Sequence, residues 1–391
     1  MMSEAEFDVA IIGGGIAGAA AAREASLRGL RVVLLEKNTF GSATSSKSSK
    51  LIHGGLRYLE TAWFAMAKGR LGEAWKNFIF VCSSLRESKT LAHTFPELVK
   101  PISMLVPFYP SRQRNHFLMV SGCIFYGILG KLLSGSHFPK ILWNKQAVLK
   151  EIPQILPEGL SGGIILWDHT TDDHALVNAL IQSAVERGSK CFENAKVTAC
   201  EKTENLYKIQ TQINREVKYF RARKVVNATG PWADETRRAL EPWKGVHEDM
   251  IVPVAGSHLE FKQFINRSMA LEADDGRLFF VINKKGISRV GTTERAEPDP
   301  ENANISEGEI EYLLKELTRL FPSVSLKRED IIARDCGIRP LAKPEHTANP
   351  HEISREHVIH RTPDGIYHLL GVKITDHRRA AEELVNLLGN A

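Results

Sequence analysis

The chain has 391 residues, of which 43% are hydrophobic and 25% are charged, and its formal net charge is +5 with histidine neutral. This composition is ordinary for a folded globular protein and excludes extensive disorder, and the length favours two domains. The mild positive charge gives no reason to expect nucleic-acid binding, and the five cysteines, which form no CxxC pair, argue against a disulfide framework or a cysteine zinc site.

The start of the chain predicts a βαβ unit. Residues 7–12 (FDVAII) are an apolar run typical of a buried parallel strand, residues 19–28 are alanine-rich and favour a helix, and residues 31–35 predict a second strand. The acidic residues 1–6 lead directly into the first strand, so no secretory signal is expected. We therefore expect a cytoplasmic protein.

A glycine cluster joins the first strand to the helix. Residues 13–18 (GGGIAG) fit the pattern G-x-G-x-x-G, whose glycines permit a tight turn, a close approach to a pyrophosphate and close packing of helix on strand. Glu36 ends the second strand, where a carboxylate binds a ribose and opposes a 2′-phosphate, so FAD or NAD is favoured over NADP. The cofactor-binding residues predicted in this unit are Gly13, Gly15, Ile16, Ala17, Gly18, Glu36 and Lys37.

The rest of the sequence predicts further helices and several runs of strands. Residues 63–91 have amphipathic helical spacing, and the prolines of the predicted strand 99–108 would confine it to a sheet edge. Residues 117–133 are apolar but short, which leaves open a buried core helix and an interfacial membrane helix. The other expected elements are a helix from Asp172, strands 195–202, 207–212, 217–222, 223–227, 251–261, 278–283 and 288–291, a helix 307–320 begun by Ser306, strands 331–338, 357–360 and 366–370, and a helix 375–388.

One acidic cluster resembles a metal site in composition. It contains Asp168, Asp172 and Asp173 together with His169 and His174. Acidic residues also favour the first turn of a helix, because the N-terminal end of the helix dipole attracts negative charge. We interpret the cluster as a loop followed by a helix start and expect no metal.

The segment after the βαβ unit is rich in hydroxyl groups and carries a family signature. Residues 44–60 (TSSKSSKLIHGGLRYLE) resemble the signature of the FAD-dependent, quinone-linked glycerol-3-phosphate dehydrogenases, which are similar to the amino-acid-oxidase type of flavoenzyme. The resemblance covers nearly all of residues 7–388. Further matching segments follow in order, at 227–232 (NATGPW), 256–258 (GSH), 291–293 (GTT), 337–341 (GIRPL), 353–355 (ISR) and 373–375 (KIT) followed by Arg378.

Three features depart from the family pattern. Val372 stands before Lys373 where a second glycine is usual, and Asp376 and His377 stand where a threonine and a tyrosine are usual. Family members also continue into a C-terminal helical domain, which we expect this chain to lack. The departures keep open a truncated, non-catalytic FAD-binding paralogue. A second alternative, an FAD-dependent oxidase or dehydrogenase of a 2-hydroxy acid or amino acid, is opposed by the several candidate arginines, because carboxylate sites often need fewer cations.

The resemblance implies an α/β fold with two domains. It implies a discontinuous, Rossmann-like FAD-binding domain and an α+β substrate domain built on an antiparallel sheet that covers the flavin ring. We assign residues 1–77, 169–243 and 330–391 to the FAD-binding domain, and residues 78–168 and 244–329 to the substrate domain.

FAD is the implied cofactor, and the matching segments imply more of its contacts. They lie in the hydroxyl-rich segment, in the segments that match the family further along the chain, and on one intervening strand. These expected contacts are Thr44, Ser45, Ser46, Ser48, Ser49, Lys50, Leu51, His53, Val197, Ala228, Thr229, Gly230, Trp232, Arg339, Gly371, Val372, Lys373, Ile374 and Thr375.

The implied reaction oxidises sn-glycerol 3-phosphate to dihydroxyacetone phosphate, with a hydride passing from carbon 2 to flavin N5. The substrate phosphate requires cations, and a guanidinium fork matches its oxygens. Arg57 and Arg339 lie in apolar contexts (GGLRYL, CGIRPL) that disfavour a solvated face, whereas Arg355 is implied by the resemblance. Tyr58, His258 and Lys373 complete the implied substrate contacts.

A general base is also needed, and histidine is the natural choice near neutral pH. The family match favours His258 over its rival His53, and Lys373 would stabilise developing negative charge. The predicted catalytic residues are therefore His258, Arg57, Arg339 and Lys373.

Quinone is the acceptor that the resemblance implies, which requires contact with a membrane. Residues 112–143 mix basic residues (Arg112, Arg114, Lys131, Lys140) with Phe117, Phe125, Tyr126, Phe138 and Trp143, as an interfacial segment does. A core position in the substrate domain is equally compatible with this composition. The sequence leaves open the oligomeric state and whether oxygen replaces quinone.

Overall fold

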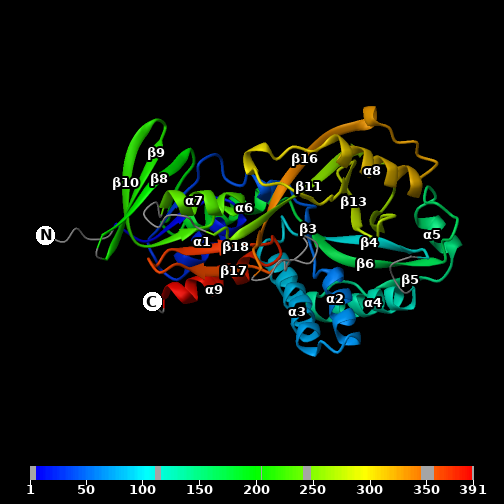
Figure 1. Cartoon of the computed structure of the whole chain (residues 1–391). Coiled ribbons are helices and arrows are strands. Elements are labelled where there is room, and N and C mark those ends of the chain that lie inside the picture. The colour runs from blue at the N-terminus through cyan, green and yellow to red at the C-terminus, as the bar shows by residue number, and fades with distance from the viewer. Residues whose placement is uncertain (1–5, 111–115, 204, 241–247, 345–355, 390–391) are drawn as a thin grey trace.

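The computed structural model describes residues 6–110, 116–203, 205–240, 248–344 and 356–389, which fold around two sheets (Figure 1). The first sheet has the strand order β17-β18-β10-β1-β2-β7. Its centre is β1 (Phe7–Ile12), which pairs in parallel with β2 (Val32–Leu35) and with β10 (Glu216–Asn227). The other strands of this sheet are β7 (Lys190–Phe192), β8 (Ala195–Thr203), β9 (Leu206–Ile213), β17 (Val358–Arg361) and β18 (Tyr367–Leu370).

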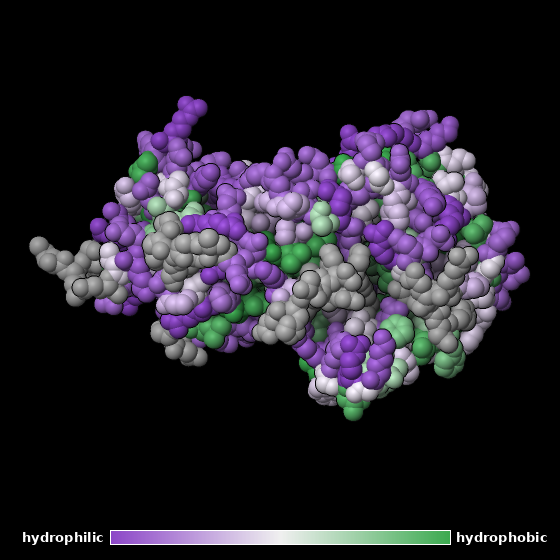
Figure 2. All heavy atoms as spheres, viewed as in Figure 1, coloured by the Kyte–Doolittle hydropathy of each residue, from purple (hydrophilic) through white to green (hydrophobic). Residues whose placement is uncertain are grey.

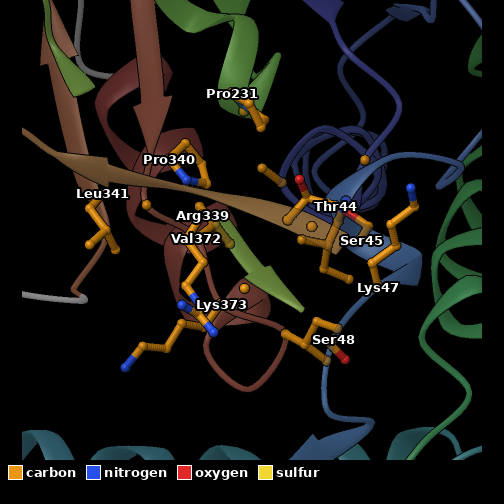
Figure 3. A pocket seen from close by; sticks show the side chains of 18 of the residues that line it. Thr44, Ser45, Lys47, Ser48, Pro231, Arg339, Pro340, Leu341, Val372 and Lys373 are labelled. Atoms are coloured by element: carbon orange, nitrogen blue, oxygen red, sulfur yellow. Dashed lines mark hydrogen bonds between the residues drawn. The ribbon is translucent and has the colours of Figure 1, made fainter. Parts of the chain in front are cut away.

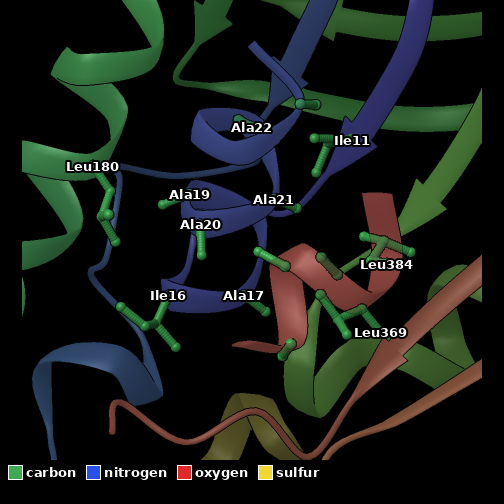
Figure 4. Packing of buried hydrophobic residues seen from close by; sticks show 14 of the residues in the cluster. Ile11, Ile16, Ala17, Ala19, Ala20, Ala21, Ala22, Leu180, Leu369 and Leu384 are labelled. Atoms are coloured by element: carbon green, nitrogen blue, oxygen red, sulfur yellow. The ribbon is translucent and has the colours of Figure 1, made fainter. Parts of the chain in front are cut away.

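Helix α1 (Ile16–Leu27) packs on this sheet together with α6 (Asp173–Val185) and α9 (His377–Gly389) (Figure 4). Four consecutive alanines, residues 19–22, allow the three helices to approach closely, since alanine adds little bulk. A Cβ atom on Gly18 would overlap the carbonyl oxygen of Gly13, so only glycine permits this contact between helix and turn. Leu180 and Leu384 fill the flanks of the cluster, and burying each such side chain stabilises the fold by about 1.5–3 kcal/mol.

The second sheet has the order β15-β11-β14-β13-β12-β4-β6-β3, with β16 on β11 and β5 on β6. It is antiparallel except for the short pairing of β12 with β4. Its strands are β3 (Leu51–Ile52), β4 (Lys100–Phe108), β5 (Lys140–Leu142), β6 (Gly162–Thr170), β11 (Ile251–Lys262), β12 (Ser268–Glu272), β13 (Leu278–Lys284), β14 (Ile287–Gly291), β15 (Arg295–Ala296) and β16 (Ile331–Ala342).

Helices cover the second sheet on two sides. Helix α8 (Glu307–Leu320) packs on β11, β13 and β14 and begins with a capping box formed by Ser306 and Glu309, as the Ser306 N-cap predicts. On the other side lie α2 (Leu56–Ala67), α3 (Leu71–Thr94) and α4 (His116–Leu129). Two short helices, α5 (Lys145–Glu151) and α7 (Ala233–Leu240), complete the fold.

The predicted fold class, a Rossmann-like sheet joined to a largely antiparallel one, is confirmed. The domain limits stay a prediction. Strands β3 and β16 pair within the second sheet, although they lie in the segments 1–77 and 330–391 that the sequence assigns to the cofactor domain.

Strand β4 is not an edge strand, so that prediction is wrong. It pairs with β6 along its whole length and with β12 through Met104 and Leu105. Its prolines, Pro101 and Pro107, lie outside the two-residue pairing with β12, which is why a flanked strand tolerates them. The two expected strands 217–222 and 223–227 form one continuous strand, β10.

The interpretation of the acidic cluster is half right. Asp172 caps α6 by accepting a 3.1 Å hydrogen bond from the Ala175 amide, and Asp173 is the first residue of that helix. Asp168 and His169, however, are buried residues of β6 and belong to no loop.

Candidate active site

A cavity of about 1760 Å³ runs between the two sheets. It begins at Glu36 and Lys37 beyond β2, passes the glycine turn and the hydroxyl-rich segment, and ends where Lys373 and the loop before α9 face the second sheet. Figure 3 shows Thr44, Ser45 and Ser48 on one side of this space, with Arg339 and Lys373 on another. Residues far apart in the sequence therefore meet along one elongated cavity.

The nucleotide end has the features of a dinucleotide site. The Glu36 carboxylate is fixed by hydrogen bonds from the Gly14 amide (2.6 Å) and the Asn38 amide (2.8 Å). Gly13 has φ +103°, and a Cβ atom there would lie 2.6 Å from the Ala228 carbonyl oxygen. The N-terminus of α1 opens at Gly15 onto the cavity, where amide groups and the helix dipole favour a pyrophosphate.

Asp173, which is fully buried at the start of α6, anchors the hydroxyl-rich segment. Asp173 accepts hydrogen bonds from the Ser48 amide (3.2 Å) and the Ser48 hydroxyl (2.8 Å), and it pairs with the Lys50 ammonium. The Thr44 hydroxyl donates a 2.8 Å hydrogen bond to the Ile338 carbonyl oxygen of β16. These contacts hold the segment along the cavity.

Most predicted cofactor contacts line this cavity. The exceptions are Gly18, which packs α1 on the glycine turn, and Ser46 and Lys50, which tie the hydroxyl-rich segment together through a 2.6 Å hydrogen bond from Lys50 to the Ser46 carbonyl oxygen. The long cavity, the fixed ribose-binding carboxylate and the open helix end fit a bound FAD.

At the far end, three matching segments of the sequence meet on adjacent strands. In the pairing of β11 with β16, His258 lies opposite Asp335, and Gly256 lies opposite Gly337. Because side chains alternate along a strand, Arg339, two residues beyond Gly337, lies on the same face of the sheet as Asp335 and His258. A Cβ atom on Gly256 would overlap the Arg339 guanidinium, so the glycine makes room for that side chain.

His258 is buried, and its Nε2 lies 2.9 Å from the Ser49 hydroxyl. Burial lowers its pKa to about 4, although Asp335 opposes that shift. The imidazole is therefore neutral near pH 7 and has a basic nitrogen. A Cβ atom on Gly291 of β14 would lie 2.6 Å from its Cδ2, so glycine is required beside the ring.

Two cations, Arg339 and Lys373, line the same cavity as this histidine. The Arg339 guanidinium donates a 2.7 Å hydrogen bond to the Thr292 hydroxyl and lies 3.6 Å from Glu294. The Lys373 ammonium donates a 2.8 Å hydrogen bond to the Tyr58 hydroxyl and lies over the rings of Tyr58 and Phe80. Arg57 belongs to α2 but its side chain lies outside the described residues, and Arg355 lies outside them altogether.

His53 occupies the loop before α2 and lines the same cavity. The amide of this residue donates a 3.3 Å hydrogen bond to the Thr375 hydroxyl, so it links the hydroxyl-rich segment to the loop before α9. The next residue, Gly54, donates its amide to the Tyr126 hydroxyl at 2.9 Å, and Tyr126 in turn donates to Asp168. Burial raises the pKa of Asp168 to about 7.

Of the three positions that depart from the family pattern, Asp376 and His377 are buried, whereas Val372 is partly exposed, and both Val372 and Asp376 line the cavity. Asp376 accepts a 3.0 Å hydrogen bond from the Ser84 hydroxyl of α3. His377 is fully enclosed, and its Nδ1 donates to the Ile374 carbonyl oxygen at 2.6 Å. Burial lowers the pKa of His377 to about 4. Both residues fix the start of α9 beside the cavity.

Sequence reasoning missed several of these groups. Asp335, Tyr126 and the buried role of Asp173 depend on strand register and packing. At the nucleotide end of the cavity, Glu301 accepts hydrogen bonds from the Lys37 ammonium (2.6 Å) and the Trp232 indole (2.7 Å). No local pattern near residue 301 signals this contact.

Comparison with known proteins agrees with this geometry. A family model described as FAD dependent oxidoreductase matches residues 8–375. The chain belongs to the FAD-dependent oxidoreductase family. The predicted cofactor, FAD, and the predicted oxidoreductase class are thereby confirmed.

Within that family, the chain is similar to glycerol-3-phosphate dehydrogenases. It is 31% identical to the aerobic glycerol-3-phosphate dehydrogenase of Staphylococcus saprophyticus over 99% of this chain and 68% of the relative. A glycerol-3-phosphate dehydrogenase from Bacillus halodurans, solved in complex with FAD, has a TM-score of 0.76 and 26% identity, and the alignment covers 100% of this chain and 65% of that one. The chain thus spans about two thirds of the length of these relatives.

A shorter neighbour has a similar fold over most of its length. The L-alpha-glycerophosphate oxidase of Mycoplasma pneumoniae, with FAD bound, has a TM-score of 0.73 and 21% identity, covering 98% of this chain and 94% of that one. At this identity the likeness concerns the fold of this FAD-dependent oxidoreductase and not its substrate.

Proposed function

We propose that this FAD-dependent oxidoreductase converts sn-glycerol 3-phosphate to dihydroxyacetone phosphate. When bound, FAD would take the hydride that leaves carbon 2 of the substrate. The proposal is supported by family membership, and one structural observation carries it. A buried neutral histidine, His258, and a guanidinium, Arg339, share one face of the second sheet at the end of the dinucleotide cavity.

The cations suit a phosphorylated substrate. Arg339 would bind the phosphate dianion, because a guanidinium offers paired donors to phosphate oxygens. Lys373, held over two aromatic rings, lies where it can stabilise negative charge on the substrate oxygen. Tyr58 would orient that ammonium, and Arg57 and Arg355 stay proposed as further phosphate ligands.

His258 would accept the proton of the substrate 2-hydroxyl. Its lowered pKa keeps the ring unprotonated at neutral pH, so Nε2 is available as a base. The Ser49 hydroxyl, 2.9 Å from Nε2, holds the ring toward the hydroxyl-rich segment. Substrate binding would exchange this contact for one with the substrate hydroxyl.

The test is anaerobic mixing of the FAD-bound protein with sn-glycerol 3-phosphate, followed through the visible flavin absorbance. We expect bleaching by this substrate and none by glycerol, because the unphosphorylated compound lacks the group that Arg339 binds. Arg339→Ala should lose bleaching, whereas Arg334→Ala, an exposed arginine of the same strand, should keep it. Retained FAD with no bleaching of the wild type would contradict the proposal.

Two alternatives are decided by the same experiment. Bleaching by a 2-hydroxy acid or an amino acid, and not by the phosphorylated substrate, would assign the cavity to a carboxylate substrate. A protein that holds FAD and is bleached by none of these compounds would be the non-catalytic paralogue that the departures at Val372, Asp376 and His377 keep open.

We further propose that electrons pass to quinone at the inner face of the cytoplasmic membrane. One helix segment, Phe117–Ser134, is long and apolar enough by length and composition to cross a membrane, and a third of it (33%) is buried in the fold. Within residues 112–143, Tyr126 lies in the core, whereas Phe117 and Trp143 are exposed by 77% and 80%. Arg112 and Arg114 lie outside the described residues.

Exposed aromatic residues continue onto the neighbouring helices. Trp63 of α2 and Trp75 of α3 are exposed by 48% and 65%. At the lower tip of the molecule, where Figure 1 places α2 and α3, hydrophobic side chains reach the surface among hydrophilic ones (Figure 2). Exposed tryptophan and phenylalanine beside lysine suit the headgroup region of a membrane.

Vesicle sedimentation tests this surface. We expect the protein to bind vesicles that contain anionic lipid, and the double variant Trp75→Ser with Trp143→Ser to bind about tenfold more weakly, because two aromatic side chains no longer enter the interface. Tyr219→Ser, an exposed aromatic of β10 in the first sheet, is the matched control. Equal binding by all three proteins would contradict the proposed membrane surface.

A further inference from the structure

An ionic chain crosses the second sheet behind His258. The cross-strand pairs place His258 opposite Asp335, and Glu260 opposite Arg289, on three adjacent strands, β14, β11 and β16. His258 and Glu260 lie on the same face of β11 because they are two residues apart. Arg289 is 5% exposed, which is rare for an arginine unless it is paired.

Successive contacts link Glu260, Arg289 and Asp335 to His258. Arg289 holds Glu260 at 2.8 Å with one guanidinium nitrogen and Asp335 at 2.8 Å with another, and its Nε donates to the Ser48 carbonyl oxygen at 3.1 Å. Asp335 Oδ1 then lies 3.5 Å from His258 Nδ1. Nothing in the proposed reaction uses Asp335 or Arg289 directly.

We propose that Asp335, held by Arg289, is a positioning residue that keeps the proton of neutral His258 on Nδ1 and leaves Nε2 as the basic atom. This inference rests on the proposed function. In the proton step, the substrate O–H bond breaks and an N–H bond forms at Nε2. The electrons of the O–H bond form the carbonyl, and the hydride from carbon 2 would go to bound FAD. The new positive charge on the ring then faces the Asp335 carboxylate.

The surroundings explain why such a carboxylate is needed. Arg289 and Arg339 are both close enough to His258 to disfavour a positive ring, and burial acts in the same direction. Asp335 is the group that opposes them, with its carboxylate kept charged by Arg289 and His258, which hold its pKa low against burial. Glu260 lies on the far side of Arg289 and accepts a 2.8 Å hydrogen bond from the other terminal guanidinium nitrogen, so one arginine charge is shared between two carboxylates.

The Ser49 contact agrees with this tautomer. With the proton on Nδ1, Nε2 accepts the 2.9 Å hydrogen bond from the Ser49 hydroxyl. A ring with the proton on Nε2 would direct an N–H bond at the substrate hydroxyl and present no base. A carboxylate on the Nδ1 side is the arrangement that orients catalytic histidines in general.

The test compares Asp335→Asn with Glu151→Gln in the FAD-bound protein. Both carboxylates pair with an arginine at 2.8 Å and have side-chain exposures of 25% and 22%, but Glu151 lies in α5, away from the cavity. We expect Asp335→Asn to lower kcat for flavin reduction by about 10- to 100-fold. KM should change little because Asp335 does not touch the substrate, and Glu151→Gln should match the wild type.

Two further readouts separate positioning from a structural role. Nitrogen NMR of labelled histidine should show Nδ1 protonated in the wild type and a changed proton distribution in Asp335→Asn. The double variant His258→Ala with Asp335→Asn should be no slower than His258→Ala alone, because Asp335 acts through His258. Unchanged kcat with an unchanged tautomer, or fully multiplicative losses, would overturn the inference.

The failure of each proposal is distinguishable. A wild type that sn-glycerol 3-phosphate does not bleach contradicts the proposed function, whereas the NMR comparison still tests the role of Asp335 in that protein. If Asp335→Asn does not retain FAD, Asp335→Glu preserves the charge while displacing the carboxylate. It should then show an intermediate kcat, and a wild-type kcat in this variant would count against positioning.

Discussion

The ammonium of Lys373, in the loop before α9, donates a 2.8 Å hydrogen bond to the hydroxyl of Tyr58 in α2 and lies 4.3 Å from the centre of the same ring. One tyrosine thus fixes a cation by both its polar and its aromatic parts. The contact joins a loop of the cofactor-binding sheet to a helix beneath the second sheet. It therefore sets the position of the charge at the end of the cavity.

Replacing this lysine should slow flavin reduction strongly. We expect Lys373→Met to lower kcat by about 10²–10³, the usual loss for one preorganised electrostatic contact, and Tyr58→Phe to lower it by about tenfold. Stopped-flow measurement of flavin bleaching checks both. Lys208→Met is the control, since Lys208 lies 4.5 Å from the ring of Tyr219 on the remote β9–β10 ribbon. A wild-type rate in Lys373→Met would refute the assigned role.

The glycine beside Arg339 should control affinity for the phosphate. Gly256→Ala places a methyl group against the Arg339 guanidinium and should raise KM by about 10- to 100-fold, as expected when a charge-assisted contact worth about 1.5–3 kcal/mol is disturbed. Steady-state kinetics with sn-glycerol 3-phosphate gives the value. Gly308→Ala in α8, where a Cβ atom meets nothing within 4 Å, should leave KM unchanged and raise stability slightly. An unaltered KM in Gly256→Ala would show that Arg339 does not bind substrate.

Buried histidines should make the fold sensitive to acid. Burial lowers the pKa of His377 from 6.5 to about 4, so its contribution to stability is complete above pH 6.5 and is lost as pH falls toward 4. At one pKa unit per 1.36 kcal/mol, that contribution is on the order of 3 kcal/mol.

The variant His377→Asn should separate this contribution from other acid effects. We expect a lower unfolding temperature than the wild type at pH 7.5 and a shallower decline between pH 6.5 and 4.5. Thermal unfolding followed by circular dichroism measures both. His93→Asn, at an exposed position of α3, should track the wild type throughout. Parallel pH curves for His377→Asn and the wild type would contradict the assignment.

The buried anchor of the hydroxyl-rich segment should govern retention of FAD. Asp173→Asn leaves the Lys50 ammonium without its carboxylate, which typically destabilises a buried pair by about 3–5 kcal/mol. We expect faster release of FAD, by at least about tenfold, and a lower unfolding temperature. Release is followed by the rise in fluorescence of free FAD on dilution. Glu186→Gln, exposed at the end of the same helix, is the control, and equal release rates would count against the anchor.

Local features of the fold could be predicted from the sequence. The glycine turn, Glu36, the helix start at Asp172 and the cap at Ser306 act within one helix or one βαβ unit, and each was found where its pattern places it. Strands β6 and β12 were missed. Strand β6 (GGIILWDHT) is buried along most of its length, but its leading glycines and its polar end interrupt the apolar run, so neither an apolar run nor an alternation marks the whole strand. The edge prediction for β4 failed because prolines exclude a neighbouring strand only where that strand would pair with them, and this depends on a register that the sequence does not give.

Some residues of the candidate site could likewise be predicted from the sequence, and others could not. Segments that match the family gave His258, Arg339 and Lys373, and the structure brings them to one cavity. Asp335 and Arg289 could not be predicted, since their importance arises from the register of three strands far apart in sequence. Tyr126 fell in a stretch whose composition suited core and membrane equally, and its hydrogen bond to Gly54 exists only after folding.

The strand order of the first sheet has a consequence for synthesis of the protein in the cell. Strand β1 leaves the ribosome first, yet its parallel neighbour β10 follows about two hundred residues later, and β18 closes the other side of β10 near residue 370. Until β10 is made, the β10-facing edge of the hydrophobic strand β1 has no hydrogen-bonding partner. This long interval leaves β1 without its second parallel neighbour while most of the chain is being made, and it exposes a hydrophobic strand edge to aggregation and to chaperones.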